Sequence, residues 1–181
     1  MPMRVRDVCL SLCLLLALPV ARADLPSPLR AETTSLQQVG QGRLTWFGFG
    51  VYRASLWSAD GKVPMANPGN PLALSLWYER AFSRDQLIDI TRNEWERLAL
   101  APAETRETWA RQLGAIWSDV GKGDNLTALV IPGSETRFYD GRRLLGRITD
   151  PGFGPAYVAI WLDERSAVAD LRKALIGKGS R

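Results

Sequence analysis

The sequence predicts an α+β domain in which helices cover one side of an antiparallel β-sheet. Three observations support this prediction. Short apolar runs bounded by turn residues recur along the chain, which is typical of antiparallel strands. Two longer segments, 83–98 and 102–117, repeat apolar residues at the helical period. They separate an early group of strands from a later one, and two further helices follow, an order that favours α+β over alternating α/β folds.

The first 23 residues are expected to be a secretory signal peptide. Two arginines precede a short apolar run at 8–18, and a small-x-small site follows at 21–23. Cleavage after Ala23 would leave a single exported domain, 24–181, in the periplasm. No later run is apolar for long enough to span a bilayer, so no transmembrane segment is expected in the mature chain.

Composition removes several classes of function. The chain has no histidine, and both cysteines, Cys9 and Cys13, fall within the predicted signal peptide. A thiol nucleophile, a Ser–His relay and a typical zinc or copper site are therefore excluded for the mature chain. No acidic cluster indicates another metal site, and no cofactor is expected. Without a block of Lys and Arg, nucleic-acid binding has little support.

The first elements surround a run rich in aromatics and glycines at 42–57. An extended N-terminal arm at 24–31 should lead to a short strand at 36–39 that turns at 40–42 into the aromatic run. We interpret that run as two strands, or as one long bent strand, at the centre of the sheet.

Alternation within the aromatic run predicts which side chains face the helices. Phe47, Phe49 and Val51 should share one face, and Trp46 and Tyr52 the other, unless a bend at Gly48 or Gly50 shifts the phase. We assign the first face to the helices because it carries no polar group. The second face should meet solvent or the N-terminal arm.

A loop at 58–71 separates the aromatic run from a strand at 72–78. Ser83 and Gln86 then form a capping box that begins a helix with Leu87, Ile88, Thr91, Trp95 and Leu98 on one face. Pro102 fits the first turn of a second helix, whose buried stripe is Trp109, Leu113, Ile116 and Trp117.

The C-terminal elements are a turn at 121–124, a strand at 126–131 and a hairpin of 136–139 with 142–148 around Asp140 and Gly141. Asp150 and Pro151 predict the start of a helix that buries Phe153, Tyr157, Ile160 and Trp161. Ser166 should cap a last helix, with Leu171 and Leu175 inward, that Gly177 ends.

Five segments resemble the bacterial chalcone isomerase-like proteins in their order and spacing. They are 48–57 (GFGVYRASLW), 74–78 (LSLWY), 117–124 (WSDVGKGD), 150–153 (DPGF) and 160–163 (IWLD). The resemblance covers nearly all of the mature chain. It implies an open-faced β-sandwich, in which a layer of helices lies on a long antiparallel sheet and a ligand cleft lies between them.

The residues that the plant chalcone isomerases use are not found at the matching positions. Those enzymes use an early Arg, a Thr before the Gly-Val-Tyr segment, and a Tyr-x-x-Lys-x-x-x-Asn helix face. Here no Arg lies between 31 and 42, and the Thr position holds Phe47. In the register set by the capping box, the helix positions hold Leu87, Ile90 and Glu94. The resemblance therefore supports the fold, and no catalytic residue is assigned.

The first hypothesis is a non-catalytic protein that binds a small amphipathic or fatty-acid-like ligand in the cleft, as non-enzymatic relatives with this fold do. An apolar pocket with one or two polar anchors suits such a ligand. The candidate ligand-binding residues are Tyr52, Arg53, Arg92, Trp95 and Tyr157, with Tyr78 and Arg137 as further polar candidates.

Two alternatives remain open. One is an intramolecular lyase or isomerase in which Tyr52, its pKa lowered by Arg53 or Arg92, stabilises an enolate or phenolate. The other is a structural or partner-binding protein of the envelope, marked by an exposed aromatic patch. A cavity lined by Tyr or Arg would favour the first hypothesis or the lyase, and a filled core would favour the envelope protein. The sequence does not indicate the oligomeric state.

Overall fold

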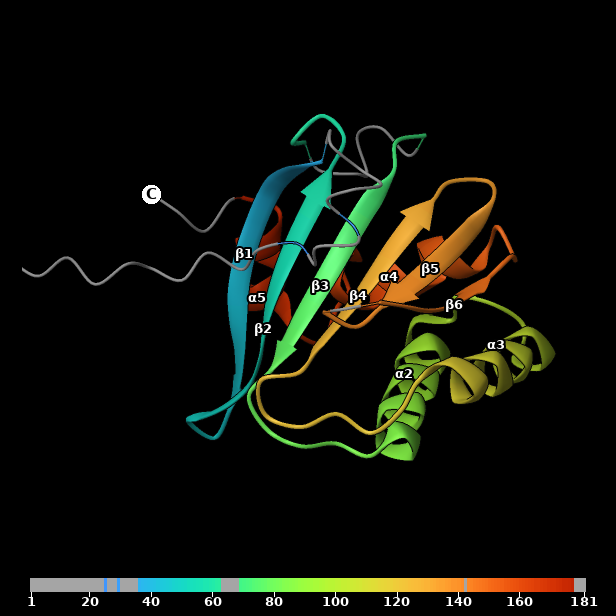
Figure 1. Ribbon diagram of the computed structural model, residues 1–181, viewed down its shortest axis with the longest axis horizontal. Helices are drawn as coiled ribbons and strands as arrows, with labels where there is room; N and C mark the ends of the chain where they lie inside the picture. The colour runs from blue at the N-terminus through green and yellow to red at the C-terminus, as the bar shows by residue number, and fades with distance from the viewer. Residues whose placement is uncertain (1–24, 26–28, 30–35, 63–68, 142, 178–181) are drawn as a thin grey trace, which may run out of the picture.

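The computed structural model describes residues 25, 29, 36–62, 69–141 and 143–177, and one six-stranded sheet organises them (Figure 1). Every strand pairs antiparallel with its neighbour in the chain, so the spatial order is also the sequence order. The strands are β1 (Gln37–Trp46), β2 (Phe49–Ser58), β3 (Leu72–Tyr78), β4 (Asn125–Ile131), β5 (Glu135–Tyr139) and β6 (Leu144–Ile148). The predicted signal peptide lies outside the described residues.

Four helices of the described ranges lie on one side of the sheet (Figure 1). They are α2 (Arg84–Leu98), α3 (Ala103–Ile116), α4 (Phe153–Leu162) and α5 (Ala169–Leu175). Helices α3, α4 and α5 contact the strands of the sheet, and α2 packs on α3 and α4. The predicted α+β class, with helices on one side of an antiparallel sheet, is confirmed. In the part of the chain that the structure describes, no helix is both long enough and apolar enough to cross a bilayer.

The aromatic run forms a β-hairpin, so the first of the two predicted arrangements is confirmed. The predicted turn at 40–42 is wrong, because β1 runs through those residues without interruption. The chain turns instead at Phe47 and Gly48, whose φ angles of 49° and 80° suit a two-residue hairpin loop. The predicted position at the centre of the sheet is also wrong, since β1 is an edge strand.

A β-bulge in β2 changes the expected pattern of faces. Pairing passes from Gly50 opposite Thr45 directly to Tyr52 opposite Leu44, which leaves Val51 as the extra residue. Beyond the bulge, Tyr52 and alternate residues of β2 face the helices. The assignment of Phe47 and Phe49 to that face is wrong, because their side chains are 86% and 75% exposed.

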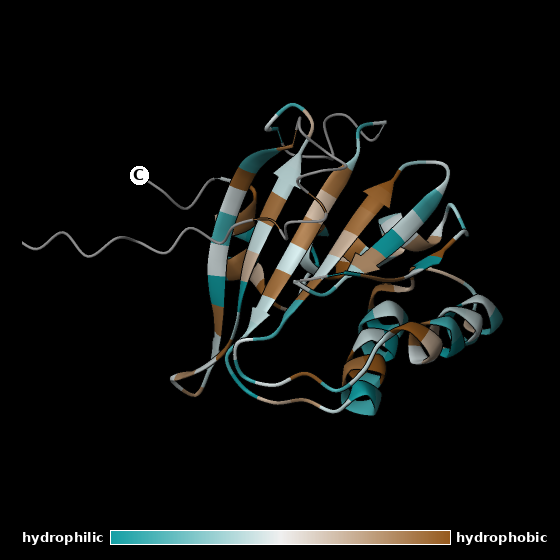
Figure 2. Cartoon of the chain, viewed as in Figure 1, coloured by the Kyte–Doolittle hydropathy of each residue, from teal (hydrophilic) through white to brown (hydrophobic). Residues whose placement is uncertain are grey.

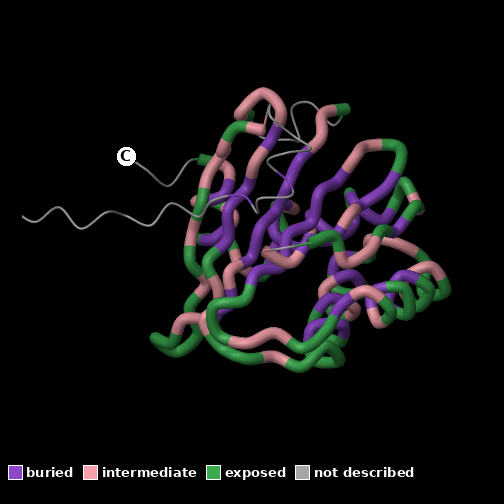
Figure 3. The backbone as a smooth tube through the Cα atoms, viewed as in Figure 1, coloured by how far each residue is buried: buried purple, intermediate pink, exposed green. Residues whose placement is uncertain are grey.

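The core lies between the sheet and the helices, where strands β3 and β4 are buried along most of their length (Figure 3). Leu72, Leu74 and Leu76 share the helix-facing side of β3, and the alternation of apolar and polar residues along this strand is visible in Figure 2. Gly40 lets α5 approach β1 closely, because a Cβ atom there would lie 2.3 Å from the carbonyl oxygen of Ala174.

Helix α2 has the predicted beginning and the predicted buried face. The Ser83 hydroxyl accepts from the Gln86 amide, and the Gln86 side chain accepts from the Ser83 amide, which completes the capping box. Its five predicted core residues are all buried. Trp95 is fully buried and donates its indole N–H to the carbonyl of Ala156 in α4, so it fastens α2 to α4.

The last two helices begin later than predicted. Asp150 does not cap α4; its carboxylate accepts from the Gly152 amide and from the Trp109 indole, and helical structure begins at Phe153. Ser166 does not cap α5 directly. Its hydroxyl donates to the Ile160 carbonyl and accepts from the amide of Val168, the residue before the first residue of the helix. The predicted end at Gly177 is confirmed by its positive φ angle and its bond to Ala174.

The opposite face of the sheet is partly covered. Most of the predicted N-terminal arm lies outside the described residues, but Leu25 and Leu29 are both buried. They form a second apolar cluster with Ala73, Leu129 and Tyr139 on the side of the sheet away from the helices. The arm residues therefore contact the sheet face away from the helices, whereas the prediction that Trp46 and Tyr52 belong to that face is wrong, because both line the cleft on the helix side.

Candidate functional site

A cleft of about 560 Å³ opens between the sheet and the helices, near the end of the sheet at which the β1–β2 hairpin turns. We call it the sheet–helix cleft. Strands β1–β3 form one wall, and α2 and α4 form the other. Most of its side chains are apolar, including Leu44, Val51, Leu76, Leu87, Ile160 and Trp161. Its volume is in the usual range of small-molecule sites, which is about 300–1,000 Å³.

Three tyrosines contribute phenol hydroxyls to the lining of the cleft. Tyr52 accepts a hydrogen bond of 2.8 Å from the indole N–H of Trp161 in α4. The ring of Tyr78 meets that of Tyr52 edge to face, with centroids 6.1 Å apart. Tyr157 completes the group from α4. Within the described residues, the hydroxyls of Tyr78 and Tyr157 have no hydrogen-bond partner, so both can donate to a ligand.

Burial keeps these three phenols neutral. Desolvation raises the pKa of Tyr52 to about 12; the Trp161 hydrogen bond opposes the shift, and the nearby Glu94 adds to it. Burial likewise raises the pKa values of Tyr78 and Tyr157 above that of a free phenol, and the neighbouring phenols contribute. At neutral pH the cleft therefore offers hydrogen-bond donors and no phenolate base.

Arg80 stands at the edge of the cleft as its cationic group. It lies two residues after the end of β3, and its guanidinium lies 4.9 Å from the centroid of the Phe82 ring. No carboxylate pairs with it among the residues that the structure describes. Glu94, on the helical wall, is instead paired with Arg97 at 2.6 Å. The cation at Arg80 is thus available to an acidic ligand.

The structure brings together only some of the predicted ligand-binding residues. Tyr52 and Tyr157 line the cleft, while Trp95 is part of the core behind it. Arg53 lies on the opposite face of the sheet, near Glu79. Arg92 points toward α3, where its Nε atom forms an ion pair of 2.9 Å with Glu107 that lacks the linear geometry of a hydrogen bond.

Arg80 was missed by the sequence analysis. Arg80 lies two residues after the apolar strand 72–78, but the turn that brings its side chain to the cleft depends on tertiary packing, which no local pattern indicates. Of the further candidates, Tyr78 lines the cleft, whereas Arg137 pairs with Glu135 in β5.

The positions that correspond to the plant helix motif do face the cleft. Leu87, Ile90 and Glu94, the residues that the capping-box register matches to that motif, all line it. Phe47, at the position of the plant Thr, lies outside it at the hairpin tip. Two aliphatic residues and a carboxylate therefore stand where the plant enzymes hold a phenol, an ammonium and an amide. Such a wall suits an apolar ligand and gives little stabilisation to developing negative charge.

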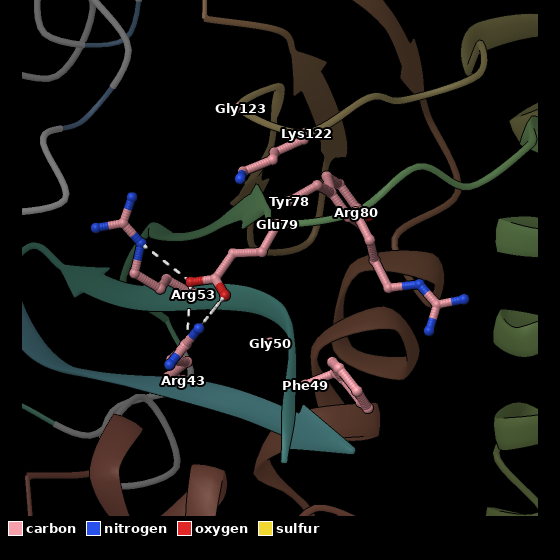
Figure 4. A pocket seen from close by; sticks show the side chains of 9 residues that line it. All are labelled: Arg43, Phe49, Gly50, Arg53, Tyr78, Glu79, Arg80, Lys122 and Gly123. Carbon is pink, nitrogen blue, oxygen red and sulfur yellow. Dashed lines mark hydrogen bonds and ion pairs between the residues drawn. The ribbon is translucent and has the colours of Figure 1, made fainter. Parts of the chain in front are cut away.

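A second, more open depression of about 670 Å³ lies on the other side of Tyr78 and Arg80 (Figure 4). In it, Arg43 forms a bidentate ion pair with Glu79, with a shortest distance of 2.6 Å, and Arg53 lies 3.7 Å from the same carboxylate. Figure 4 shows that Arg80 extends away from this group. We call this depression the basic cup. No group of three potential metal ligands occurs in the described ranges.

Comparisons with known proteins agree on the architecture. No curated protein matches the sequence. Among solved structures, a fatty-acid binding protein of Arabidopsis thaliana aligns over 80% of this chain and 88% of its own, with a TM-score of 0.64 and 9% sequence identity, a likeness of fold. The family model described as Chalcone isomerase-like matches residues 17–177. Since this match covers nearly the whole sequence, the chain belongs to the chalcone isomerase-like family.

Proposed function

We propose that the protein binds a small amphipathic acid, such as a fatty acid, in the sheet–helix cleft without transforming it. The observation that carries this proposal is the combination of an apolar cleft, two unbonded phenol hydroxyls and an unpaired arginine at its edge. Each methylene group of a ligand chain that leaves water contributes about 0.8 kcal/mol. The hydroxyls and Arg80 are available to the acid group.

The relatives agree with this proposal. The chain shares its fold with an Arabidopsis protein whose description is fatty-acid binding. At 9% identity the likeness concerns architecture, so the argument for this chain depends on its own cleft.

The lyase alternative has weaker support in the site. It requires an arginine that lowers the pKa of Tyr52, whereas burial raises that pKa to about 12. Arg53 and Arg92 do not line the cleft. The envelope alternative predicted an exposed aromatic patch, and one is present at the hairpin tip beside the cleft. We therefore propose that this patch has a role beside ligand binding and does not replace it.

The test is a calorimetric titration of the delipidated protein with dodecanoate. Wild type should bind it, and Arg80→Gln should bind at least about fivefold more weakly, since hydrogen bonds to charged groups are worth roughly 1.5–3 kcal/mol. Arg111→Gln is the matched control, because Arg111 lies on α3 away from the cleft. Absence of dodecanoate binding, or equal affinity of wild type and Arg80→Gln, would reject the proposal.

We also propose that the protein is exported, with cleavage after Ala23 giving a cysteine-free domain of 24–181. The basic, apolar and small-residue segments of the first 23 residues support this proposal. An intact-mass measurement on the periplasmic fraction tests it. A mass that retains Cys9 and Cys13 would contradict it.

A further inference from the structure

The tip of the β1–β2 hairpin exposes three aromatic side chains. Trp46, Phe47 and Phe49 are 64%, 86% and 75% exposed, and the Trp46 ring stacks on that of Phe47 with centroids 5.9 Å apart. We call these three residues the aromatic tip. In the described part of the chain, only Ile90 and Leu144 are other large hydrophobic residues with such exposure. Scattered exposed apolar residues are ordinary, but three within four positions mark an interaction surface.

The backbone conformation at Phe47 favours Gly, Asn or Asp over an aromatic residue. Phe47 has a φ angle of 49°, in the left-handed region that Gly, Asn and Asp occupy far more readily than a bulky aromatic. A turn selected only to reverse the chain would carry one of those residues. An aromatic side chain kept in this conformation, and almost fully exposed, is consistent with a functional constraint.

The aromatic tip is continuous with the mouth of the sheet–helix cleft. Trp46 lines the cleft from the hairpin, and the exposed Ile90 lines it from α2. The opening is thus bordered by apolar side chains from two separate elements. Figure 1 shows that the hairpin projects past the end of β3, at the end of the sheet where the connections before α2 and β4 also lie.

The basic cup adjoins the same end of the molecule. Arg43, Arg53 and Lys122 lie near the carboxylate of Glu79, and Arg80 lines the same cup with its guanidinium directed away from that carboxylate (Figure 4). Phe49 of the aromatic tip is part of the lining. Arg43 and Arg53 remain about half exposed despite their ion pairs with Glu79. Since Tyr78 and Arg80 line both the cup and the cleft, positive charge and the apolar mouth lie side by side.

We propose that the aromatic tip and the basic cup dock the protein on an anionic lipid surface with the cleft mouth toward the lipid. Trp and Phe favour the interface between headgroups and acyl chains. The cup supplies cations to anionic headgroups beside them. This inference rests on the proposed function, because docking lets an amphipathic ligand pass between bilayer and cleft without crossing water.

Vesicle flotation with the full mature chain tests the docking. The protein should float with vesicles of phosphatidylcholine containing about one-third phosphatidylglycerol, and much less with phosphatidylcholine alone. Phe47→Ser with Phe49→Ser should weaken binding at least about tenfold, since it removes apolar surface that would leave water. Arg53→Gln with Lys122→Gln should weaken it by about fivefold per charge on anionic vesicles only. Leu144→Ser, which alters an exposed apolar residue on the far edge strand, is the control.

Ligand titration of the same variants separates this inference from the proposed function. Phe47→Ser with Phe49→Ser should bind dodecanoate as wild type does, because neither side chain lines the cleft. Dodecanoate binding without vesicle binding would overturn the docking and leave the cleft assignment intact. Vesicle binding that the Phe variant retains would also overturn it. A third outcome would also overturn the docking: the wild type forms a dimer, the Phe variant does not, and neither binds vesicles. A second copy of the chain would then cover the aromatic tip.

Discussion

The buried phenols of Tyr52, Tyr78 and Tyr157 should make the stability of the protein sensitive to alkaline pH. In the unfolded chain each phenol loses its proton near pH 10. In the folded protein the pKa of Tyr52 is about 12, and burial raises the other two as well. The stabilisation is therefore complete below about pH 10 and is lost as pH rises through the folded pKa values.

A urea titration series between pH 8 and pH 11.5 measures this effect. The midpoint should be steady to about pH 10 and then fall. Below about pH 10, Tyr52→Phe should lower the free energy of unfolding by about 1 kcal/mol, because Trp161 loses its acceptor. It should also reduce the alkaline slope, because one titrating group is gone. An identical slope in the two proteins would show that the Tyr52 phenol does not titrate as argued.

Two phenylalanines test the corrected assignment of the sheet faces. Phe49→Ala should change the unfolding free energy by less than about 0.5 kcal/mol, because exposed positions tolerate substitution. Phe153→Ala should cost about 3–5 kcal/mol, since its ring is fully buried among Trp95, Trp109 and Tyr157. Urea denaturation compares them. A large loss of unfolding free energy for Phe49→Ala would contradict the corrected assignment, because it would indicate that this ring is part of the core.

At the scale of elements, the contact between α5 and β1 depends on glycine. Gly40→Ala would place a Cβ atom against the backbone of Ala174 and Leu175, which cannot move aside as a side chain can. We expect a loss of about 1–3 kcal/mol in urea denaturation. Gly69→Ala is the matched control, because no atom lies within 4 Å of its added Cβ. Equal stability of the two variants would mean that α5 does not pack against β1 at this position.

Elements with local signals could be predicted from the sequence, and those set by distant contacts could not. The capping box at Ser83 and the positive φ at Gly177 depend on neighbouring residues, so both were predicted correctly. Gly40 resembles a turn residue locally, but its role is set by α5, which lies more than 120 residues later. The bulge at Val51 shifts the alternation of the aromatic run, and no periodicity rule foresees it.

The same distinction applies to the candidate site. Tyr52 and Tyr157 lie in apolar runs, and each carries a hydroxyl at the end of an apolar ring. Such side chains are recognisable candidates for a pocket wall. Arg53, the other predicted anchor in this run, is the next residue after Tyr52. Adjacent residues of a strand point to opposite faces, so it lies on the other side of the sheet, in the basic cup. Arg80 enters the site only through the path of the chain after β3, which the sequence does not encode locally.

At the scale of the whole molecule, the proposed function depends on one cleft that neither the sheet nor the helices form alone. Strands β1–β3 supply Tyr52 and Tyr78, α4 supplies Tyr157, and the connection from β3 to α2 supplies Arg80. Ala167, an exposed residue between α4 and α5, also lines this cleft. A large side chain at Ala167 should obstruct the cleft without disturbing the core.

Native mass spectrometry of the protein as purified tests the central claim most directly. Wild type should carry a noncovalent adduct with the mass of an amphipathic acid, and Ala167→Trp should lack it while keeping wild-type stability in urea. A wild-type spectrum that shows only the bare polypeptide, before and after incubation with dodecanoate, would contradict the claim. An adduct of equal abundance in Ala167→Trp would also contradict it, because the ligand would then lie outside the sheet–helix cleft.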